Sequence, residues 1–306
     1  MKLFSMKIDG KDRAGVLIGE EALDVTAFSE ISERSGSEIA GPFADALDLY
    51  LAGIQRLEEI ASQVASDAAL AEKCRRAGAM RSLSTIKLNA PVLAPGKILA
   101  VGLNYAAHAA EQNKKPPETP LIFSKCVTAL IGPGDLIRLP RISDQIDYEA
   151  ELAVVIGKEA RSVSASDAFD YVAGYMIMND VTARDLQRNE KQWTRAKGLD
   201  TFAPCGPWLV TADEINNPHS LDLRLSVNGE VKQSSNTNDL IFKIPQLIEF
   251  ISQDLTLRPG DIISTGTPSG VGVYSNPPVF LKDGDQIEIN IARIGTLRNS
   301  VKGNAD

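Results

Sequence analysis

Two acidic residues lead directly into a run of apolar residues in the middle of the chain. Glu149 and Glu151 are two positions apart, and residues 152–156 continue as an unbroken apolar segment. Side chains alternate between the two faces of a β-strand, so both carboxylates project from one face. Carboxylates held together away from water repel each other, and a bound divalent cation is the commonest reason to tolerate this. The pattern predicts a buried strand that carries part of a metal site, with a solvated edge strand as the alternative.

The composition indicates a globular chain with one large domain or two smaller ones. The 306 residues are 43% apolar, which is ample for a core. The formal net charge is −8 and no dense basic stripe occurs, which argues against a nucleic-acid partner. No run of 18 apolar residues is present and the first 13 residues are interrupted by charges, so neither a membrane span nor a signal peptide is expected.

The three cysteines are spaced too widely and irregularly for a disulfide framework or a zinc site. They are Cys74, Cys126 and Cys205. Reduced thiols are typical of the cytoplasm, where we expect the protein to be located. We interpret Cys126 and Cys205 as small packing residues rather than nucleophiles, because neither lies near a histidine motif.

The residue pattern changes near residue 90. Before that point, residues 1–24 alternate like a small antiparallel meander with turns at Gly10 and Gly19, and residues 44–77 carry apolar side chains at helical spacing. Prolines then flank a short apolar segment, as in a linker. We therefore predict a small α+β N-terminal domain with its linker over residues 1–90 and a second domain over residues 91–306.

The second domain is predicted to be mainly β-sheet, which makes the fold class α+β. Two segments, 166–171 and 244–255, have helical character, and the proline near the start of the latter suits a first turn. The candidate strands are residues 97–101, 121–124, 151–156, 174–178, 221–227, 261–265 and 286–291.

A third acid, Asp180, directly follows the apolar segment that ends at Met178 and Asn179. Thr182 and Asp185 have the spacing of a capping box, so a helix is predicted to start here. Asp180 would then lie at a strand-to-helix junction, rigidly held and accessible. The alternative is that it only caps a turn or the helix.

His108 and Glu111 are three residues apart in an alanine-rich segment that favours a helix, so their side chains should share one face. A carboxylate that contacts an imidazole raises its basicity and fixes its orientation, as general-base catalysis requires. The alternative is that His108 and Glu111 form an ordinary pair on the protein surface without a catalytic role.

Two further segments have the character of ligand sites. Lys197 is followed by Gly198, which permits a close approach to a bound group. Residues 265–272 follow a predicted strand and read Thr-Gly-Thr-Pro-Ser-Gly-Val-Gly. They lack the Gly-Lys-Ser/Thr ending of a nucleotide P-loop. Their hydroxyls and backbone amides could hold a carboxylate, although a plain glycine turn explains them equally well.

In this order and at these separations, the segments resemble the fumarylacetoacetate hydrolase family. The resemblance covers residues 95–301, and the N-terminal part is similar to the smaller domain of longer members. The resemblance implies a mixed β-sandwich roll for the catalytic domain and a homodimer. The matching segments are residues 102–111, 147–157, 179–187, 197–202, 227–238 and 258–272.

For the site, the resemblance implies Mg²⁺ or Mn²⁺ bound by Glu149, Glu151 and Asp180. Three oxygen ligands without cysteine or histidine suit such hard cations. His108 and Glu111 would be a water-activating dyad on a mobile lid helix, with Lys197 as a further catalytic residue. The positions assigned to substrate binding are Tyr105, Arg184, Gln187 and Thr267.

The expected substrate is a small 2-oxo or 2,4-dioxo acid. Water activated by the dyad would attack the distal carbonyl of an acylpyruvate, and a metal-stabilised pyruvate enolate would leave. The alternatives on the same site are an oxaloacetate decarboxylase, a 2-hydroxydienedioate isomerase, or a metal- and oxoacid-binding relative with little activity. Leu103 and Ala107 depart from the arginine and aspartate frequent in the family, which could change the distal group that is accepted.

Overall fold

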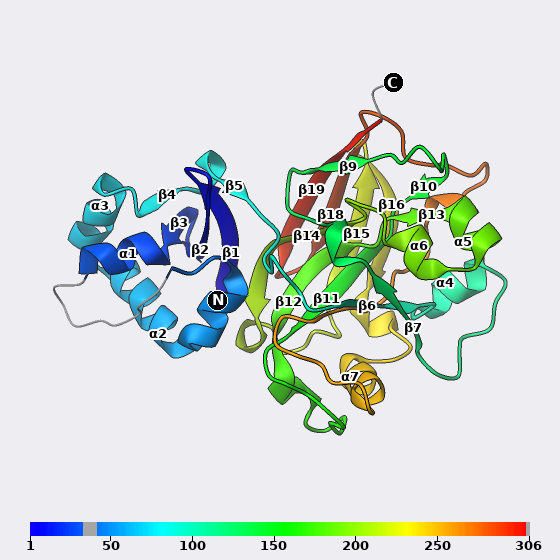
Figure 1. The fold of residues 1–306 in the computed structure, drawn as a ribbon, viewed down its shortest axis with the longest axis horizontal. Coiled ribbons are helices and arrows are strands. Elements are labelled where there is room, and N and C mark those ends of the chain that lie inside the picture. Colours follow the sequence, from blue (N-terminus) through cyan, green and yellow to red (C-terminus); the bar gives the residue numbers. More distant parts are fainter. Residues whose placement is uncertain (33–41, 304–306) are drawn as a thin grey trace.

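The computed structural model describes residues 1–32 and 42–303. Figure 1 shows a smaller N-terminal lobe, in blue and cyan, joined to a larger lobe that contains the rest of the chain. The smaller lobe contains β1 (Lys2–Ile8), β2 (Lys11–Ile18), β3 (Glu21–Asp24), α1 (Val25–Ser32), α2 (Ala46–Ser66), α3 (Ala68–Arg76), β4 (Met80–Ser82) and β5 (Lys87–Leu88).

The predicted N-terminal meander is present. β2 pairs antiparallel with β1 on one side and with β3 on the other. Gly10 and Gly19 take positive φ angles of 77° and 61° at the two turns. Glycine is favoured there because it has no Cβ to clash in the left-handed region. The helical segment predicted over 44–77 is divided into α2 and α3, because Asp67 leaves the helical conformation and its side chain caps α3 by accepting from two backbone amides. Within α2, Gly53 interrupts the helix with a φ of 124°.

A twelve-stranded sheet runs through both lobes. Its order is β4-β3-β2-β1-β14-β12-β11-β17-β6-β7, with β5 and β8 off this path. The lobes meet where β1 pairs antiparallel with β14, with Leu3 opposite Leu209. The change in sequence pattern near residue 90 therefore does not interrupt the sheet. The larger-lobe members are β6 (Ile98–Gly102), β7 (Leu121–Lys125), β8 (Leu130–Ile131), β11 (Ala150–Ile156), β12 (Val172–Asn179), β14 (Ala203–Thr211) and β17 (Ile262–Ser264).

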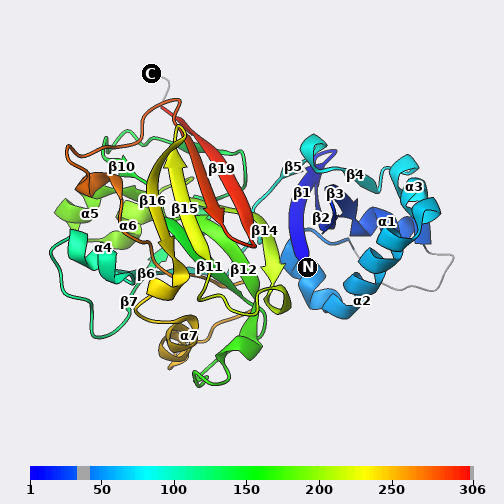
Figure 2. The same cartoon turned by 180° about the vertical axis from the view of Figure 1, so that it is seen from behind.

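A second sheet of five strands packs against the larger lobe's part of the first, and Figure 2 shows it from behind. Together the sheets form the mixed β-sandwich that the sequence predicted, with helices beside it. The order of the second sheet is β16 (Glu230–Asn236), β15 (Asp222–Val227), β18 (Gln286–Ile291), β19 (Gly295–Lys302) and β9 (Leu136–Arg138).

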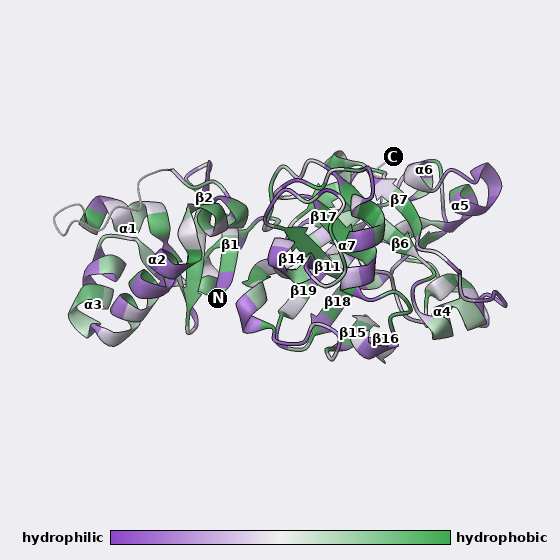
Figure 3. Ribbon diagram, turned by 90° about the horizontal axis from the view of Figure 1, so that it is seen from below, coloured by the Kyte–Doolittle hydropathy of each residue, from purple (hydrophilic) through white to green (hydrophobic). Residues whose placement is uncertain are grey.

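Alternation along β11 divides the interior into two cores. Leu152 and Val154 pack in the core between the two sheets, while Ala153 and Val155 pack in a core that α2 and the N-terminal strands complete. Every residue of β11 is buried, and Figure 3 shows much of β11 and β17 in the green of hydrophobic residues. The central strands are thus covered on both faces, one of them by the N-terminal lobe.

Three predictions about elements differ from the structure. Several strands were not predicted, the longest of them β14, β16 and β19; segment 166–171 contains only a 3₁₀ turn (Ala168–Tyr171), and α7 (Ile244–Ser252) ends three residues early. β14 carries Pro204, Gly206 and Pro207, which interrupt the usual strand pattern.

The remaining short elements gather at the end of the larger lobe that is remote from the N-terminal lobe (Figure 1). None of the helices within residues 1–32 and 42–303 has the length and apolar character needed to cross a membrane. The elements at this end are α4 (Ala106–Glu111), β10 (Ile146–Asp147), β13 (Thr182–Ala183), α5 (Arg184–Glu190) and α6 (Trp193–Lys197).

Candidate metal centre and active site

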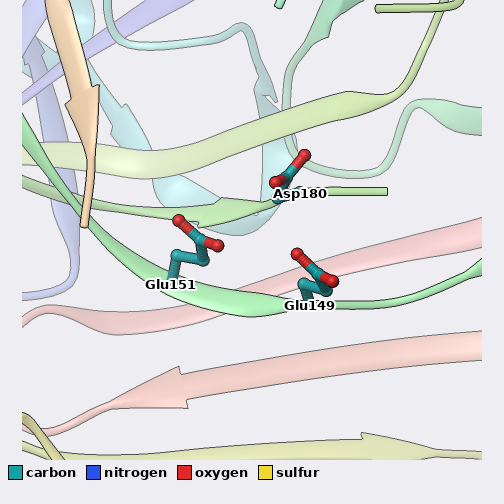
Figure 4. A group of neighbouring side chains, drawn as sticks. All are labelled: Glu149, Glu151 and Asp180. Carbon is teal, nitrogen blue, oxygen red and sulfur yellow. The ribbon is translucent and has the colours of Figure 1, made fainter. Parts of the chain in front are cut away.

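The pairing of β11 with β12 brings the three predicted acids together. Asp180 follows β12, and its backbone N–H donates to the carbonyl of Glu149 at 2.9 Å. One oxygen from each of Glu149, Glu151 and Asp180 lies within 4.8 Å of the others, and all three side chains are buried. Figure 4 shows the two glutamates rising from the same side of one strand toward Asp180. The alternation of side chains along β11 thus places the pair as the sequence pattern implied.

Three cationic side chains surround this cluster. Lys197 Nζ lies 2.7 Å from both Glu149 Oε2 and Asp180 Oδ2. Lys125 Nζ pairs with the other oxygen of Asp180, and Arg184 Nη2 lies 2.7 Å from Glu149 Oε1. These cations stabilise ionised carboxylates at a depth where water cannot do so.

Arg184 also joins the cluster to the loop over residues 265–273. Its Nε donates to Asp147 Oδ2 at 2.8 Å, and Asp147 in turn accepts from the backbone N–H groups of Gly272 and Val273. Asp147 is fully buried and precedes Glu149 by two residues. It therefore aligns both the arginine and the loop without itself reaching the triad.

The two glutamates have opposite electrostatic surroundings. Burial by itself raises the pKa of Glu149, but Lys197 and Arg184 outweigh it and hold that pKa below its usual range. Burial, together with Asp180 and Glu149, raises the pKa of Glu151 to about 8. Glu151 thus has too little positive charge near it.

These residues fit a divalent cation. Glu151 Oε2 accepts from Ser264 Oγ and Gly266 N, whereas its Oε1 has no hydrogen-bond partner among the described residues. A hard cation would supply the charge that Glu151 lacks, and carboxylate oxygens are the donors that Mg²⁺ and Mn²⁺ prefer.

The predicted His108 and Glu111 pair lies on α4, with His108 almost fully buried. His108 Nδ1 is 2.5 Å from Glu111 Oε1, and Glu111 Oε2 accepts from Gly270 N at 3.0 Å. The glycine-rich loop therefore anchors the carboxylate that orients the imidazole. The helix itself was predicted from the alanines and is present.

A cavity of about 320 Å³ opens over the carboxylate triad. Phe123 and Trp193, whose rings meet edge to face, form one apolar wall. The predicted site residues that line the cavity with the triad are His108, Arg184, Gln187, Lys197 and Thr267.

Tyr105 and Thr267 were expected to contact the substrate, but neither side chain is free to do so in this structure. Tyr105 is 1% exposed, its hydroxyl has no partner among the described residues, and burial raises its pKa. It does not line the cavity. Thr267 does, but its hydroxyl donates to Ala150 O at 3.0 Å and accepts from Gln233 Nε2 at 2.8 Å. Any contact of Tyr105 with a substrate would require its side chain to move.

Two local predictions were wrong. α5 starts at Arg184 without a side-chain cap, because the Thr182 hydroxyl donates to the carbonyl of Asp180 and Asp185 accepts from Ser143. Cys126 is exposed, since it follows the last residue of β7, whereas Cys205 is buried as expected.

Sequence reasoning missed four polar residues of the site: Lys125, Asp147, Gln112 and Gln233. Asp147 has the same two-residue spacing to Glu149 that Glu149 has to Glu151, and this regularity could have identified it. Lys125 is a lone charge at the end of an apolar strand, which is a weaker signal. Nothing local indicates Gln233, which joins Ala150 N to Thr267 and Pro268 across the fold.

Comparison with known proteins agrees with this fold and site. The sequence model described as fumarylacetoacetate (FAA) hydrolase C-terminal matches residues 97–302. The chain therefore belongs to the fumarylacetoacetate hydrolase family.

Curated relatives align over a little more than two thirds of the chain. An oxaloacetate tautomerase FAHD2A, mitochondrial, of Bos taurus is 52% identical over 220 residues, which cover 71% of this chain and 70% of that protein. The protein of the same name from Homo sapiens is 49% identical over 220 residues, with the same coverage.

Solved structures align over nearly the full chain. The fumarylacetoacetate hydrolase of Exiguobacterium antarcticum has a TM-score of 0.81 at 35% identity and covers 99% of this chain and 100% of its own. A maleylpyruvate hydrolase from Sphingobium has a TM-score of 0.75 at 34% identity, with the same coverage. A 2-hydroxyhepta-2,4-diene-1,7-dioate isomerase from Mycobacterium marinum has a TM-score of 0.73 at 34% identity and covers both chains fully.

Proposed function

We propose that the protein is a divalent-metal-dependent enzyme that catalyses keto–enol proton transfer on oxaloacetate or a similar small 2-oxo diacid. The observation that carries this proposal is the imidazole of His108, oriented by Glu111, on the wall of the same cavity as the carboxylate triad. The 49–52% identity to proteins named oxaloacetate tautomerases, over 220 residues, supports tautomerisation as the first candidate.

His108 would act as the base in the keto-to-enol direction. Its Nε2 takes a proton from C3, the C–H electrons form the C2–C3 double bond, and the carbonyl oxygen gains a proton from solvent. The Glu111 carboxylate stabilises the imidazolium that forms, because it accepts from Nδ1–H. The reverse sequence returns the proton to C3.

The other residues would hold the substrate and balance its charge. Glu149, Glu151 and Asp180 would bind Mg²⁺ or Mn²⁺, which supplies Lewis acidity that makes the hydrogens on C3 more acidic. Arg184, Gln187 and Lys197 line the cavity beside the triad and suit the carboxylate and oxo groups of a 2-oxo acid. Because the buried cations are already paired with carboxylates, the attraction for an anionic substrate would come from the bound divalent ion.

Hydrolysis of the carbon–carbon bond in acylpyruvate-like 2,4-dioxo acids is the second candidate. The dyad that would accept a proton from C3 could instead deprotonate a water that attacks the distal carbonyl, with pyruvate enolate as the leaving group. The 34% identity to a named maleylpyruvate hydrolase supports this activity. Decarboxylation of oxaloacetate needs no water and would use the same triad.

A substrate panel with the purified protein tests these candidates. Enol-oxaloacetate decay, pyruvate release from acetylpyruvate, and carbon dioxide release from oxaloacetate are followed with Mg²⁺ or Mn²⁺ and after chelator treatment. We expect metal-dependent tautomerisation to be fastest and His108→Ala to abolish it. An unchanged rate of enol decay, with and without protein, would reject the first candidate. Full turnover after removal of all divalent ions would reject the metal-dependent mechanism.

Two further predictions concern the protein in the cell. Homodimerisation is expected from the family resemblance, and sedimentation velocity of the full chain measures it. A cytoplasmic location is expected from the reduced cysteines, and several animal relatives are named as mitochondrial, so fractionation of the native source distinguishes these compartments.

A further inference from the structure

We propose that Gln112 is a positioning residue that covers the basic nitrogen of His108 and, with Lys114, favours proton transfer from carbon over the activation of water. This inference rests on the proposed function, because it concerns the base of that reaction. Gln112 and Lys114 both line the cavity, and neither belongs to the predicted dyad.

The contacts fix the orientation of the Gln112 amide. Lys114 Nζ lies 2.9 Å from Gln112 Oε1, and an ammonium group can only donate, so that atom must be the carbonyl oxygen. The amide nitrogen then faces His108 Nε2 at a distance of 2.8 Å. An amide NH₂ donates, so Nε2 accepts and carries no proton.

The same chain of donors assigns the tautomer of His108. Because Nε2 is the acceptor, the ring proton lies on Nδ1 and is donated to Glu111 Oε1. Four residues thus form one directed series: Lys114 donates to Gln112, Gln112 donates to His108, and His108 donates to Glu111. The Nε2 lone pair of the ring is thus covered by the Gln112 amide.

The side chain of Gln112 can rotate away from His108 without disturbing α4. Gln112 is the C-cap residue that follows α4, its backbone N–H is bonded to Ala109 O and Ala110 O, and its side chain is half-buried. Lys114 is exposed at the mouth of the cavity. Release of the amide is therefore a rotation of one side chain that breaks its hydrogen bonds with His108 and with Lys114, the latter at an exposed residue.

This arrangement discriminates between the two candidate reactions. The lone pair of Nε2 cannot accept a proton while the amide covers it, so a reactant must displace the amide. A substrate held by the cavity presents its C3 hydrogen at a fixed position and can do this, whereas a free water molecule competes with the amide for the same lone pair. Gln112 therefore disfavours hydrolysis more than tautomerisation.

The partition between two activities tests the inference in the metal-loaded enzyme. Tautomerisation of enol-oxaloacetate and hydrolysis of acetylpyruvate are measured for Gln112→Ala, for the similarly sized Gln112→Met, and for Lys114→Ala. We expect the ratio of hydrolysis to tautomerisation to rise about threefold to tenfold in both Gln112 variants, the effect of one hydrogen bond. We expect a smaller rise in Lys114→Ala. Lys115→Ala is the matched control, since Lys115 is the exposed neighbour without a contact to this series.

A ratio that stays within twofold of the parent in both folded Gln112 variants would overturn the inference, and so would a parallel fall of both activities. A parent protein inactive on both substrates would instead reject the proposed function. The hydrogen-bond geometry of His108 is tested independently of turnover, by long-range ¹H–¹⁵N spectra of the imidazole rings. The chain has two histidines, so His219 is an internal control.

We expect the neutral Nδ1–H tautomer for His108 in the parent, and a changed Nε2 resonance in Gln112→Ala with that of His219 unchanged. An Nε2–H tautomer in the parent would overturn the assignment.

Discussion

The N-terminal lobe and the end of the larger lobe that carries the carboxylate triad, here called the site end, differ in how far their ion pairs are buried. In the N-terminal lobe the ion pairs are on the surface, as between Arg75 and Glu21, where both side chains contact solvent. At the site end Arg184 is 5% exposed and its partners Asp147 and Glu149 are buried with it. Surface pairs add little to stability, whereas a buried charge that loses its partner is costly. Buried ion pairs, which are costly to break, thus distinguish the cavity region of the larger lobe from the N-terminal lobe.

The largest expected effect is the loss of activity from one side chain at the site. His108→Ala should lower tautomerisation by about 10²–10⁴-fold, because it removes the general base. Steady-state kinetics measure this, with Arg56→Ala in the N-terminal lobe as the control that should retain parental activity. A His108→Ala enzyme within tenfold of the parent would assign the base to another residue.

The next effect compares the stability of the two kinds of ion pair. Arg184→Met leaves Asp147 and Glu149 buried without their shared partner, and should lower the free energy of unfolding by about 3–5 kcal/mol. Arg75→Met, which breaks a solvent-exposed pair, should change it far less. Urea unfolding measures both. Equal losses in the two variants would refute the contrast between the ends.

Metal binding should stabilise the site end specifically. An ion at a hundred times its Kd adds about 2.7 kcal/mol to the free energy of unfolding if it binds only the folded chain. Thermal unfolding with and without Mn²⁺ measures the stabilisation, which should be lost in Glu151→Gln and kept in Glu21→Gln. Stabilisation that survives Glu151→Gln would place the ion elsewhere.

The smallest effect is an acid-dependent loss of stability in the larger lobe. Burial, aided by Lys243, lowers the pKa of His219 to about 4. Its Nε2 accepts from Ile244 N at the start of α7, and protonation removes this acceptor. Unfolded histidine titrates near pH 6.5, so this contribution is fully present above about pH 6.5 and declines as pH falls toward 4.

Unfolding free energies between pH 4 and 7 measure this decline. His219→Asn should flatten it, because asparagine does not titrate. The first 90 residues contain no histidine, so they supply no comparable group. An unchanged slope in the variant would assign the decline to carboxylates.

Particular elements explain why the sequence predicted some features and not others. β11 was predicted because its apolar run is local and continuous, and α4 because alanines favour helices. β14 was not, because its prolines and glycine oppose a strand and its pairing comes from strands distant in the sequence, among them β1 and β12. The predicted capping box of Thr182 and Asp185 does not form, because Thr182 donates to the carbonyl of Asp180 and Asp185 accepts from Ser143.

By itself, the sequence predicted which side chains form the candidate site: Glu149 and Glu151, just before and within β11, Asp180 after the next apolar strand, and the histidine and glutamate on one helix face. Spacing along the chain controls which side chains share a face, so these features could be read locally. The tertiary structure alone decided that Lys125 and Lys197 pair with Asp180 and that Gln112 covers His108. Such contacts depend on how distant strands pack and on which atom each donor reaches, and no local pattern encodes either.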